Sequence, residues 1–309
     1  MDQTSFERLK ETITNEALPE YEADIANPDT HPVGRARLRR YAFYERLRYF
    51  ILLYSGGEEI SGFRAQLPAL ISSFEAFLND PEAEIDVIDL AIQDYYVEAL
   101  WLLSLTKLLG FDNEIQRVAG FYLLDETNSG ADELFEALLA KLGLPSSEAE
   151  GLIHEDPYQH LLDAIKAEPG ARPQHMQLFL KHWYKGMKDC GWWGSHVRRP
   201  GTTVLDTGFF GYWAFEAGLV TYLWDIDDSS YREMQYYPKD LVDYARAHFP
   251  LNTPKNSGTL RALPGEPCPK TGEWMVGHTP RTARRFTKGE IMPELNLDTG
   301  ATIWMFVQD

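Results

Sequence analysis

The densest group of chemically capable side chains lies between residues 182 and 237. Helical spacing there puts Glu216 on one face with Phe209, Trp213 and Val220, so we expect its carboxyl to point inward among aromatic rings. A buried carboxylate is costly unless it is paired. The preceding loop offers cations that could pair with it, namely His196, Arg198 and Arg199. A structural ion pair is therefore the expected role of Glu216.

The same segment admits a catalytic interpretation. A buried Glu216 with a raised pKa could act as a general acid beside His196 or Asp206, as in carboxylate-dependent hydrolases. Aromatic residues could line a sugar-binding or base-stacking groove, although aromatics at helical spacing more often form core: Trp183, Tyr184, Trp192 and Trp193. The chain lacks GxSxG, Walker A and HExxH motifs, and it lacks a GxGxxG with a suitably spaced acidic residue. We therefore assign no catalytic residue and expect no enzyme.

Metal and cofactor chemistry has little support in the sequence. The run from Asp225 to Asp228 lacks the spaced oxygen ligands and the glycine of a calcium loop, and capping of a helical turn is a commoner use of such aspartates. Cys190 and Cys268 are the two cysteines, and no CxxC motif occurs. We expect free thiols, no bound metal and no cofactor.

Charge gives the first indication of a partner. The formal net charge is −18, from 47 acidic and 29 basic residues. A surface of this sign repels nucleic acid, which disfavours direct nucleic-acid binding, and it attracts a basic protein. Solubility alone is the competing explanation. Residues 255–309 hold seven basic and six acidic residues, a balance of +1, which leaves −19 on the rest of the chain.

The acidity falls into three tracts. Residues 80–98 contain seven acidic residues and no basic one, and on a helix Glu82, Asp86 and Asp89 would form one stripe. An earlier basic stripe could neutralise this tract within the fold: Arg35, Arg39 and Arg46. The second tract, residues 125–168, has eleven acidic residues against two lysines. The third is the Asp225 to Asp228 run. A basic partner could supply the missing charge, and the residues that we assign to its binding surface are Glu82, Asp86, Asp89, Asp94, Asp225, Asp227 and Asp228.

Apolar periodicity predicts a mainly α protein, a bundle of about ten helices in two packed parts with a small β-rich C-terminal appendage. Helices are expected over 3–26, 34–54, 58–78, 84–109, 113–123, 131–142, 146–154, 158–167, 173–188, 207–224 and 238–247. Strands are expected over 258–263, 272–277, 282–287 and 301–307. The predicted domains are 1–168, 174–250 and 251–309, with a Pro- and Gly-containing linker between the first two. The N-terminus lacks a signal-peptide pattern and no stretch has 18 consecutive apolar residues, so we expect a cytoplasmic protein without membrane contact.

Two motifs resemble the PoNi immunity proteins. The string HWYKGMK…W…SH…GYWAFEAGLV…DIDD…YYPKDLV resembles their C-terminal domain, and RYAFYERLRYFILLYSGGEEISGFRAQLPALISSFEAFL resembles their N-terminal domain. Together they cover residues 35–250. The resemblance implies a mainly helical, non-catalytic protein that protects bacteria from PoNe-type DNase toxins, commonly delivered by type VI secretion, by binding the toxin. The tail from residue 264 resembles short C-terminal segments of other bacterial immunity proteins.

The resemblance also implies scaffold roles for the residues of the C-terminal motif, which are Trp183, Tyr184, His196, Gly211, Tyr212, Trp213 and Glu216. The implied partner is a cognate basic nuclease toxin, whose cationic cleft an acidic surface would occlude, and binding beside the cleft is an alternative. Self-association is left open. The competing functions are a hydrolase that uses Glu216 and His196 in an aromatic pocket, and a general acidic adaptor protein.

Overall fold

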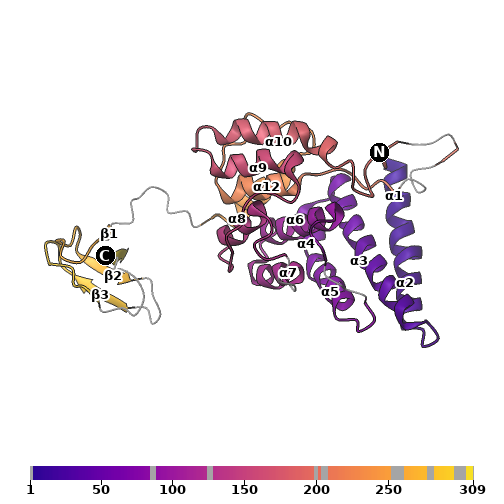
Figure 1. Cartoon of the computed structure of the whole chain (residues 1–309), viewed down its shortest axis with the longest axis horizontal. Coiled ribbons are helices and arrows are strands. Elements are labelled where there is room, and N and C mark those ends of the chain that lie inside the picture. The colour runs from indigo at the N-terminus through magenta and orange to yellow at the C-terminus, as the bar shows by residue number, and fades with distance from the viewer. Residues whose placement is uncertain are drawn as a thin grey trace. The chain divides into compact units, whose positions relative to one another are not determined.

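The computed structural model describes the 309-residue chain except for residues 1–2, 84–87, 124–127, 198–200, 203–207, 252–260, 277–281, 296–303 and 309. The chain forms two compact units, residues 1–249 and residues 250–309. The first unit is helical and the second holds a small β-sheet (Figure 1). The prediction of a mainly α protein with a β-rich C-terminal appendage is confirmed.

The N-terminal helices follow the predicted pattern. Helix α1 (Gln3–Thr12) continues through a π-helical turn (Ile13–Ala17) into α2 (Leu18–Ala26), so residues 3–26 form one helical run. Helix α3 (Pro32–Ser55) follows and packs against it. The predicted apolar face of α3 is buried, which confirms its orientation: Phe43, Leu47, Phe50, Ile51 and Tyr54.

The single helix predicted over 58–78 is wrong, because it consists of α4 (Ile60–Arg64) and α5 (Leu67–Leu78). Pro68 lies in the first turn of α5, where its missing N–H and its ring are tolerated. Inside a longer helix the same ring would clash with the carbonyl of Arg64. The apolar face is buried on both sides of the break, from Phe63 to Phe74, and this continuity hid the break in the sequence.

The helix predicted over 84–109 is also too long. Helix α6 (Gln93–Leu108) begins only after Ile92, which is extended and 49% exposed. Residues 84–87 lie outside the described residues. The Asn128 side chain replaces helical bonds in the stretch before α6, since its amide donates to the Ile88 carbonyl at 2.7 Å and its oxygen accepts the Leu90 N–H at 3.3 Å. Helix α6 itself is buried on nearly all sides and forms the centre of the helical unit.

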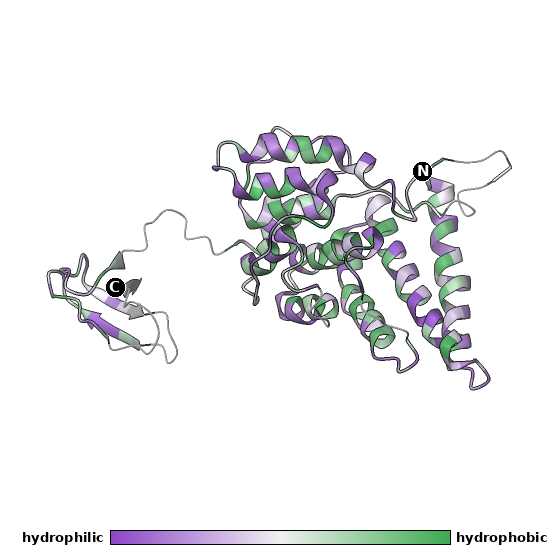
Figure 2. Ribbon diagram, viewed as in Figure 1, coloured by the Kyte–Doolittle hydropathy of each residue, from purple (hydrophilic) through white to green (hydrophobic). Residues whose placement is uncertain are grey.

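A hairpin-like pair of helices packs beside this centre. After α7 (Ile115–Tyr122) and α8 (Glu133–Lys141), helices α9 (Glu155–Lys166) and α10 (Arg172–Gly186) pack against each other, and polar and apolar residues alternate along α10 (Figure 2). The proposed linker at 168–173 falls at the junction of α9 and α10, and a division of the helical unit into two folding domains there stays a prediction.

The helix predicted over 146–154 is absent from the structure. Buried acidic side chains bind the backbone of this stretch instead. Glu136 accepts the Ser147 N–H at 2.6 Å, and Asp132 accepts the Ile153 N–H at 2.9 Å. Because the backbone groups are satisfied by these carboxylates, the stretch has no need of helical hydrogen bonds.

The last two helices of the unit are α12 (Phe215–Leu223) and α13 (Lys239–His248). Helix α12 is shorter than the predicted 207–224, because residues 208–214 are non-helical and bond to other segments: the Ala214 N–H donates to the Tyr236 carbonyl at 2.9 Å. All nine residues of α12 are buried, and it packs on α6. Among the described residues, no helix has both the length and the apolar composition to cross a bilayer.

The C-terminal unit contains β1 (Arg261–Ala262), β2 (Gly272–Val276), β3 (Thr282–Phe286) and β4 (Trp304–Gln308), close to the predicted strands. The sheet order is β1-β4-β2-β3 and the pairs are antiparallel. Its small core holds Ala262, Cys268, Trp274, Phe286, Met292 and Trp304. Cys190 and Cys268 are both free, as predicted.

Candidate functional site

Glu216 is buried as predicted, but His196, the one expected ionic partner that the structure describes, does not reach it. The Trp183 indole N–H donates to Glu216 Oε1 at 2.6 Å, and the Tyr158 hydroxyl donates to the same oxygen at 3.4 Å. His196 is exposed and bonds elsewhere, while Arg198 and Arg199 lie outside the described residues. Burial raises the pKa of Glu216 to about 7, although hydrogen bonds from Trp183 and Tyr158 oppose the shift. The expected ion pair with His196 is therefore wrong, and neutral donors take its place.

A catalytic pair of Glu216 and His196 gains no support from this geometry. His196 Nδ1 lies 3.0 Å from the Tyr212 hydroxyl oxygen and 3.2 Å from that of Tyr184, on the exposed side of the segment. Glu216 is fully buried and does not line the cavity described below. Asp206, the other suggested partner, lies outside the described residues.

The C-terminal motif instead builds a partly exposed aromatic surface, which we name the aromatic shelf and define as Tyr184, Trp193, His196, Tyr212 and Tyr236. The Tyr184 ring stacks on Trp193 and on Tyr236, each with centroids 5.6 Å apart, and lies 5.0 Å from Tyr212. Trp193 is 43% exposed. The rings form a rigid, amphipathic surface of the kind that protein interfaces favour.

The aromatic shelf continues into the core through a ladder of rings. Tyr236 lies 5.2 Å from Trp183, Trp183 stacks on Trp192 at 5.8 Å, and Trp192 lies 5.5 Å from Trp101 of α6. The shelf is therefore anchored to α6, the central helix of the unit. The scaffold role expected for the motif fits the buried Trp183. The shelf residues are half-buried or exposed, so they also present surface to the solvent.

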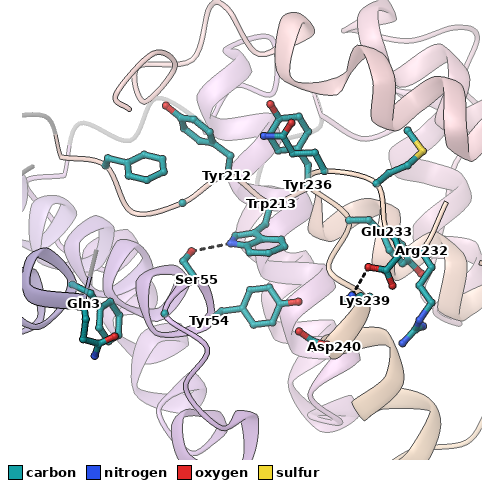
Figure 3. Close-up of a pocket in the computed structure, with 17 residues that line it drawn as sticks. Gln3, Tyr54, Ser55, Tyr212, Trp213, Arg232, Glu233, Tyr236, Lys239 and Asp240 are labelled. Carbon is teal, nitrogen blue, oxygen red and sulfur yellow. Dashed lines mark hydrogen bonds and ion pairs between the residues drawn. The ribbon is translucent and has the colours of Figure 1, made fainter. Parts of the chain in front are cut away.

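Gly211 fixes the loop in front of α12 against the end of α3. Its φ of +109° lies in the region that favours glycine, and a Cβ there would stand 1.9 Å from Ser55 Oγ. Ser55 Oγ donates to the Phe210 carbonyl and accepts the Trp213 indole N–H, both at 2.8 Å (Figure 3). The family motif thus holds this loop by close backbone approach, which agrees with a scaffold role for Gly211.

The first acidic tract does not form the predicted helical stripe. Glu82 and Asp89 are exposed in non-helical segments, and Asp86 lies outside the described residues. Asp94 is half-buried on α6 and accepts the Gly191 N–H at about 3.0 Å. Burial raises the pKa of Asp94 more than this bond lowers it. Glu82 and Asp89 are therefore exposed charges, although Asp89 also accepts the Ala91 N–H at 2.8 Å, while Asp94 is partly buried within the fold.

The predicted basic stripe neutralises only part of this tract. Arg39 forms an ion pair with Asp80, whereas Arg46 pairs with Glu22 of α2. The Arg35 guanidinium donates to the Thr30 carbonyl at 3.0 Å. No ion pair of Glu82 or Asp89 exists among the residues that the structure describes. Their charges stay available to a partner.

The buried ion pair of Arg40 and Glu98 was missed in the sequence. Their contact measures 2.7 Å, and the Arg40 guanidinium lies over aromatic rings that include Phe43 and Phe74. Burial raises the pKa of the Glu98 carboxyl more than Arg40 lowers it. A signal was present, since Glu98 is the one charged residue in the apolar run of residues 95–103.

The third acidic tract divides into one buried and two exposed carboxylates. Asp228 accepts the Tyr237 hydroxyl at 2.8 Å and pairs with Arg246 at 3.0 Å and Arg232 at 3.2 Å. Asp225 and Asp227 are exposed, and the Ser229 N–H donated to Asp227 lowers the pKa of that carboxyl. Within the described ranges, no three His, Cys, Asp or Glu side chains are placed to hold a metal ion.

A cavity of about 490 Å³ opens beside the aromatic shelf (Figure 3). Its walls come from α1, the end of α3, the loop 209–213 and the segment 232–240 that leads into α13. Tyr54, Tyr212, Trp213 and Tyr236 supply aromatic surface, and Asp240 is among the charged residues at its wall. Sequence reasoning missed this site because its walls lie far apart in the chain.

Comparison with known proteins identifies the helical unit. The family described as PoNe immunity protein (PoNi), N-terminal, matches residues 3–120, and the family described as PoNe immunity proteins (PoNi), C-terminal, matches residues 130–241. These matches define an immunity protein built of two family segments. The chain belongs to the PoNe immunity protein (PoNi) family. The two segments meet between residues 120 and 130, earlier than the division proposed from the sequence at 168–174.

A solved structure supports the fold. The crystal structure of protein PA2201 from Pseudomonas aeruginosa is similar, with a TM-score of 0.62 and 20% sequence identity over 80% of this chain and 89% of that chain. At this identity the likeness shows the fold alone. No curated protein matches the chain.

Proposed function

We propose that this chain is the immunity protein of a basic nuclease toxin, a DNase, and that it neutralises the toxin by covering its active-site cleft. The family match supports the immunity role, because both matched families are described as PoNe immunity proteins. The choice of a nuclease rests on that family and on charge. A DNase needs a cationic cleft to hold phosphates, and a chain of net charge −18 is complementary to it.

The acidic surface in this proposal is led by Glu82, Asp89, Asp225 and Asp227. These four side chains are exposed and make no ion pair among the described residues. Asp86 belongs to the proposed surface by its place in the first tract. Asp94 and Asp228, also assigned from the sequence, contribute to it more weakly because hydrogen bonds and ion pairs within the fold already hold them.

Charge sets the expected kinetics of capture. Opposite charges steer diffusional encounters and raise association rates to about 10⁸–10⁹ M⁻¹s⁻¹ at low salt. Rapid capture suits a protein that must bind an incoming nuclease before the genome is cut, and we place this event in the cytoplasm. Under this proposal the chain is a stoichiometric inhibitor rather than an enzyme.

Co-expression with the product of the neighbouring toxin gene tests the proposal. We expect the chain to restore growth of toxin-expressing cells, to co-purify with the toxin and to block its DNA cleavage at a one-to-one ratio. Reversing the charges of Glu82, Asp89, Asp225 and Asp227 together should slow association and reduce its dependence on salt. A chain that neither binds the toxin nor protects the cells would refute the immunity role, and a chain that binds without protecting would favour an acidic adaptor.

A further inference from the structure

The cavity beside the aromatic shelf has one charged group that the fold leaves unpaired. Lys239 pairs with Glu233 at 2.6 Å, and Arg232 pairs with Asp228 and Asp243. Asp240 lines the same cavity, is exposed, and makes no hydrogen bond or ion pair of its side chain among the described residues. The uncompensated charge at the cavity is therefore negative.

A buried hydroxyl next to Asp240 is only loosely engaged. Tyr54 is only 7% exposed, and its hydroxyl makes no well-aligned hydrogen bond within the described part of the chain, although the backbone N–H groups of Asp240 and Leu241 lie near it and counter part of the rise in its pKa that burial causes. Figure 3 shows this hydroxyl directed toward the side of the cavity where Asp240 lies. Buried polar atoms are nearly always paired in native proteins, so an unpaired one at a cavity wall indicates a missing polar group.

The remaining walls are aromatic. Trp213 packs on Tyr54 with centroids 4.7 Å apart, and its indole N–H is already donated to Ser55. Tyr236 borders the cavity in a left-handed backbone conformation, φ +74°, which is rare for a bulky residue. Such strain persists only where the surroundings impose it, and here it holds the Tyr236 ring between Tyr184 and the cavity.

We propose that this cavity receives an arginine side chain of the toxin, with Asp240 as its counter-charge and the Tyr54 oxygen as a second acceptor. The inference rests on the proposed function and adds a specific anchor to it. A guanidinium has five N–H donors and a planar face that stacks on aromatic rings, so it satisfies the carboxylate, the hydroxyl and the ring walls together.

The charge distribution argues against an anionic occupant. The two cations at the cavity are each held by carboxylates, and an anion would face Asp240 directly. An arginine also matches the basic toxin required by the proposed function. The neighbouring aromatic shelf would surround it with the rigid rings that anchor residues of protein interfaces commonly pack against.

The test compares single-charge variants that differ only in position. The affinity of the nuclease-inactivated toxin from the neighbouring gene is measured by calorimetry for the wild-type chain, Asp240→Asn and Asp24→Asn. Asp24 is an exposed aspartate on α2, and helical rise places it roughly 30 Å along the run from Gln3 at the cavity. We expect Asp240→Asn to raise Kd by at least about tenfold and Asp24→Asn by less than about twofold.

A second variant keeps the test valid if Asp240→Asn is poorly folded. Tyr54→Phe removes only a hydroxyl without a well-aligned partner, so it should fold nearly as well as wild type while it raises Kd by about threefold or more. If wild type binds the toxin and both variants bind equally well, the cavity proposal is overturned and the immunity role stands. If wild type fails to bind the toxin or to protect cells, both proposals fall.

Discussion

The indole N–H of Trp183 donates a 2.6 Å hydrogen bond to Oε1 of Glu216 at the centre of the helical unit. The second carboxyl oxygen of Glu216 has no well-aligned hydrogen-bond partner among the described residues, although the Trp101 indole and the Glu216 backbone N–H also favour the charged carboxylate, and no cation pairs with the group there. Neutral donors stabilise a carboxylate less than a cation does, so burial raises the pKa of Glu216 to about 7. This family-motif residue is therefore a buried acid that titrates near neutral pH.

The first prediction concerns the pH dependence of stability. Unfolding returns the pKa of Glu216 from about 7 to its ordinary 4.5, so the folded state holds the proton more tightly. The resulting stabilisation is complete below pH 4.5 and is lost as the pH rises through 7, by about 3 kcal/mol in total. Glu216→Gln cannot ionise. From pH 4 to pH 8, its free energy of unfolding should therefore rise relative to that of wild type by about 3 kcal/mol.

Urea denaturation of both proteins at pH 4, 5, 6, 7 and 8 measures this difference. The comparison removes the contribution of other titrating groups, such as Glu98, because both proteins contain them. Glu148→Gln, at an exposed position, is the matched control and should follow wild type at every pH. Parallel curves for Glu216→Gln and wild type would mean that the carboxyl is ionised and paired in the folded protein.

The second prediction separates the two neighbouring aspartates of the third acidic tract. Asp228→Asn should lower the free energy of unfolding by about 2–3 kcal/mol, since it leaves Arg246 and Arg232 without their buried counter-charge. This loss is smaller than that usual for a broken, fully buried ion pair, because both arginines are about one-third exposed and solvent screens their charges. Chemical denaturation at pH 7 measures this loss.

Asp227→Asn is its control. The side chain is exposed, and asparagine can accept the Ser229 N–H as well as aspartate does, so stability should not change. Toxin affinity should respond in the opposite order: Asp227→Asn weakens binding, and folded Asp228→Asn binds nearly as wild type. If Asp227→Asn instead lowered stability, Asp227 would be a scaffold residue. If folded Asp228→Asn instead weakened toxin binding, Asp228 would belong to the binding surface.

The third prediction uses two glycines that both have positive φ. Gly57 has φ +76° and open space where a Cβ would stand, so Gly57→Ala should cost only the backbone strain, about 1 kcal/mol. At Gly211 the new Cβ would overlap Ser55 Oγ and disturb the bond to Trp213, so Gly211→Ala should cost roughly 3 kcal/mol. Thermal and urea unfolding give both values. Equal costs would show that the loop before α12 moves away from α3 freely.

Helix positions were predictable where one apolar face was long and unbroken, as in α3 and α10, and all four strands lay near their expected residues. The break between α4 and α5 was missed because the apolar face continues across it. The errors before α6 and after α8 occurred where a side chain from a distant segment satisfies the backbone. Asn128 binds the stretch before α6, and Asp132 binds the stretch after α8. Such bonds depend on the folded structure, and no local pattern of apolar residues reports them.

In the candidate site, too, local patterns predicted some features, while features that depend on distant segments could not be predicted. Burial of Glu216 followed from its helical neighbours, but its partner Trp183 lies 33 residues away and could not be deduced from spacing. Exposure of acidic residues was equally hidden, because Asp227 and Asp228 are adjacent and only one faces solvent. The cavity joins α1, α3 and α13, so Asp240 gained significance only when the fold was known.

The last prediction concerns the C-terminal unit. The core residues that the structure describes there are few, and domains near 60 residues are marginally stable, so this unit should unfold at lower urea concentration than the helical unit. The helical unit has its own core around α6 and α12. A chain ending at Pro250 should therefore retain the unfolding midpoint of the helical unit within about 1 °C. It should also retain toxin binding, since the proposed acidic residues and Asp240 precede the cut. A midpoint lowered by several degrees would instead show that the C-terminal unit stabilises the helices, and a selective loss of toxin affinity would place part of the interface on the sheet.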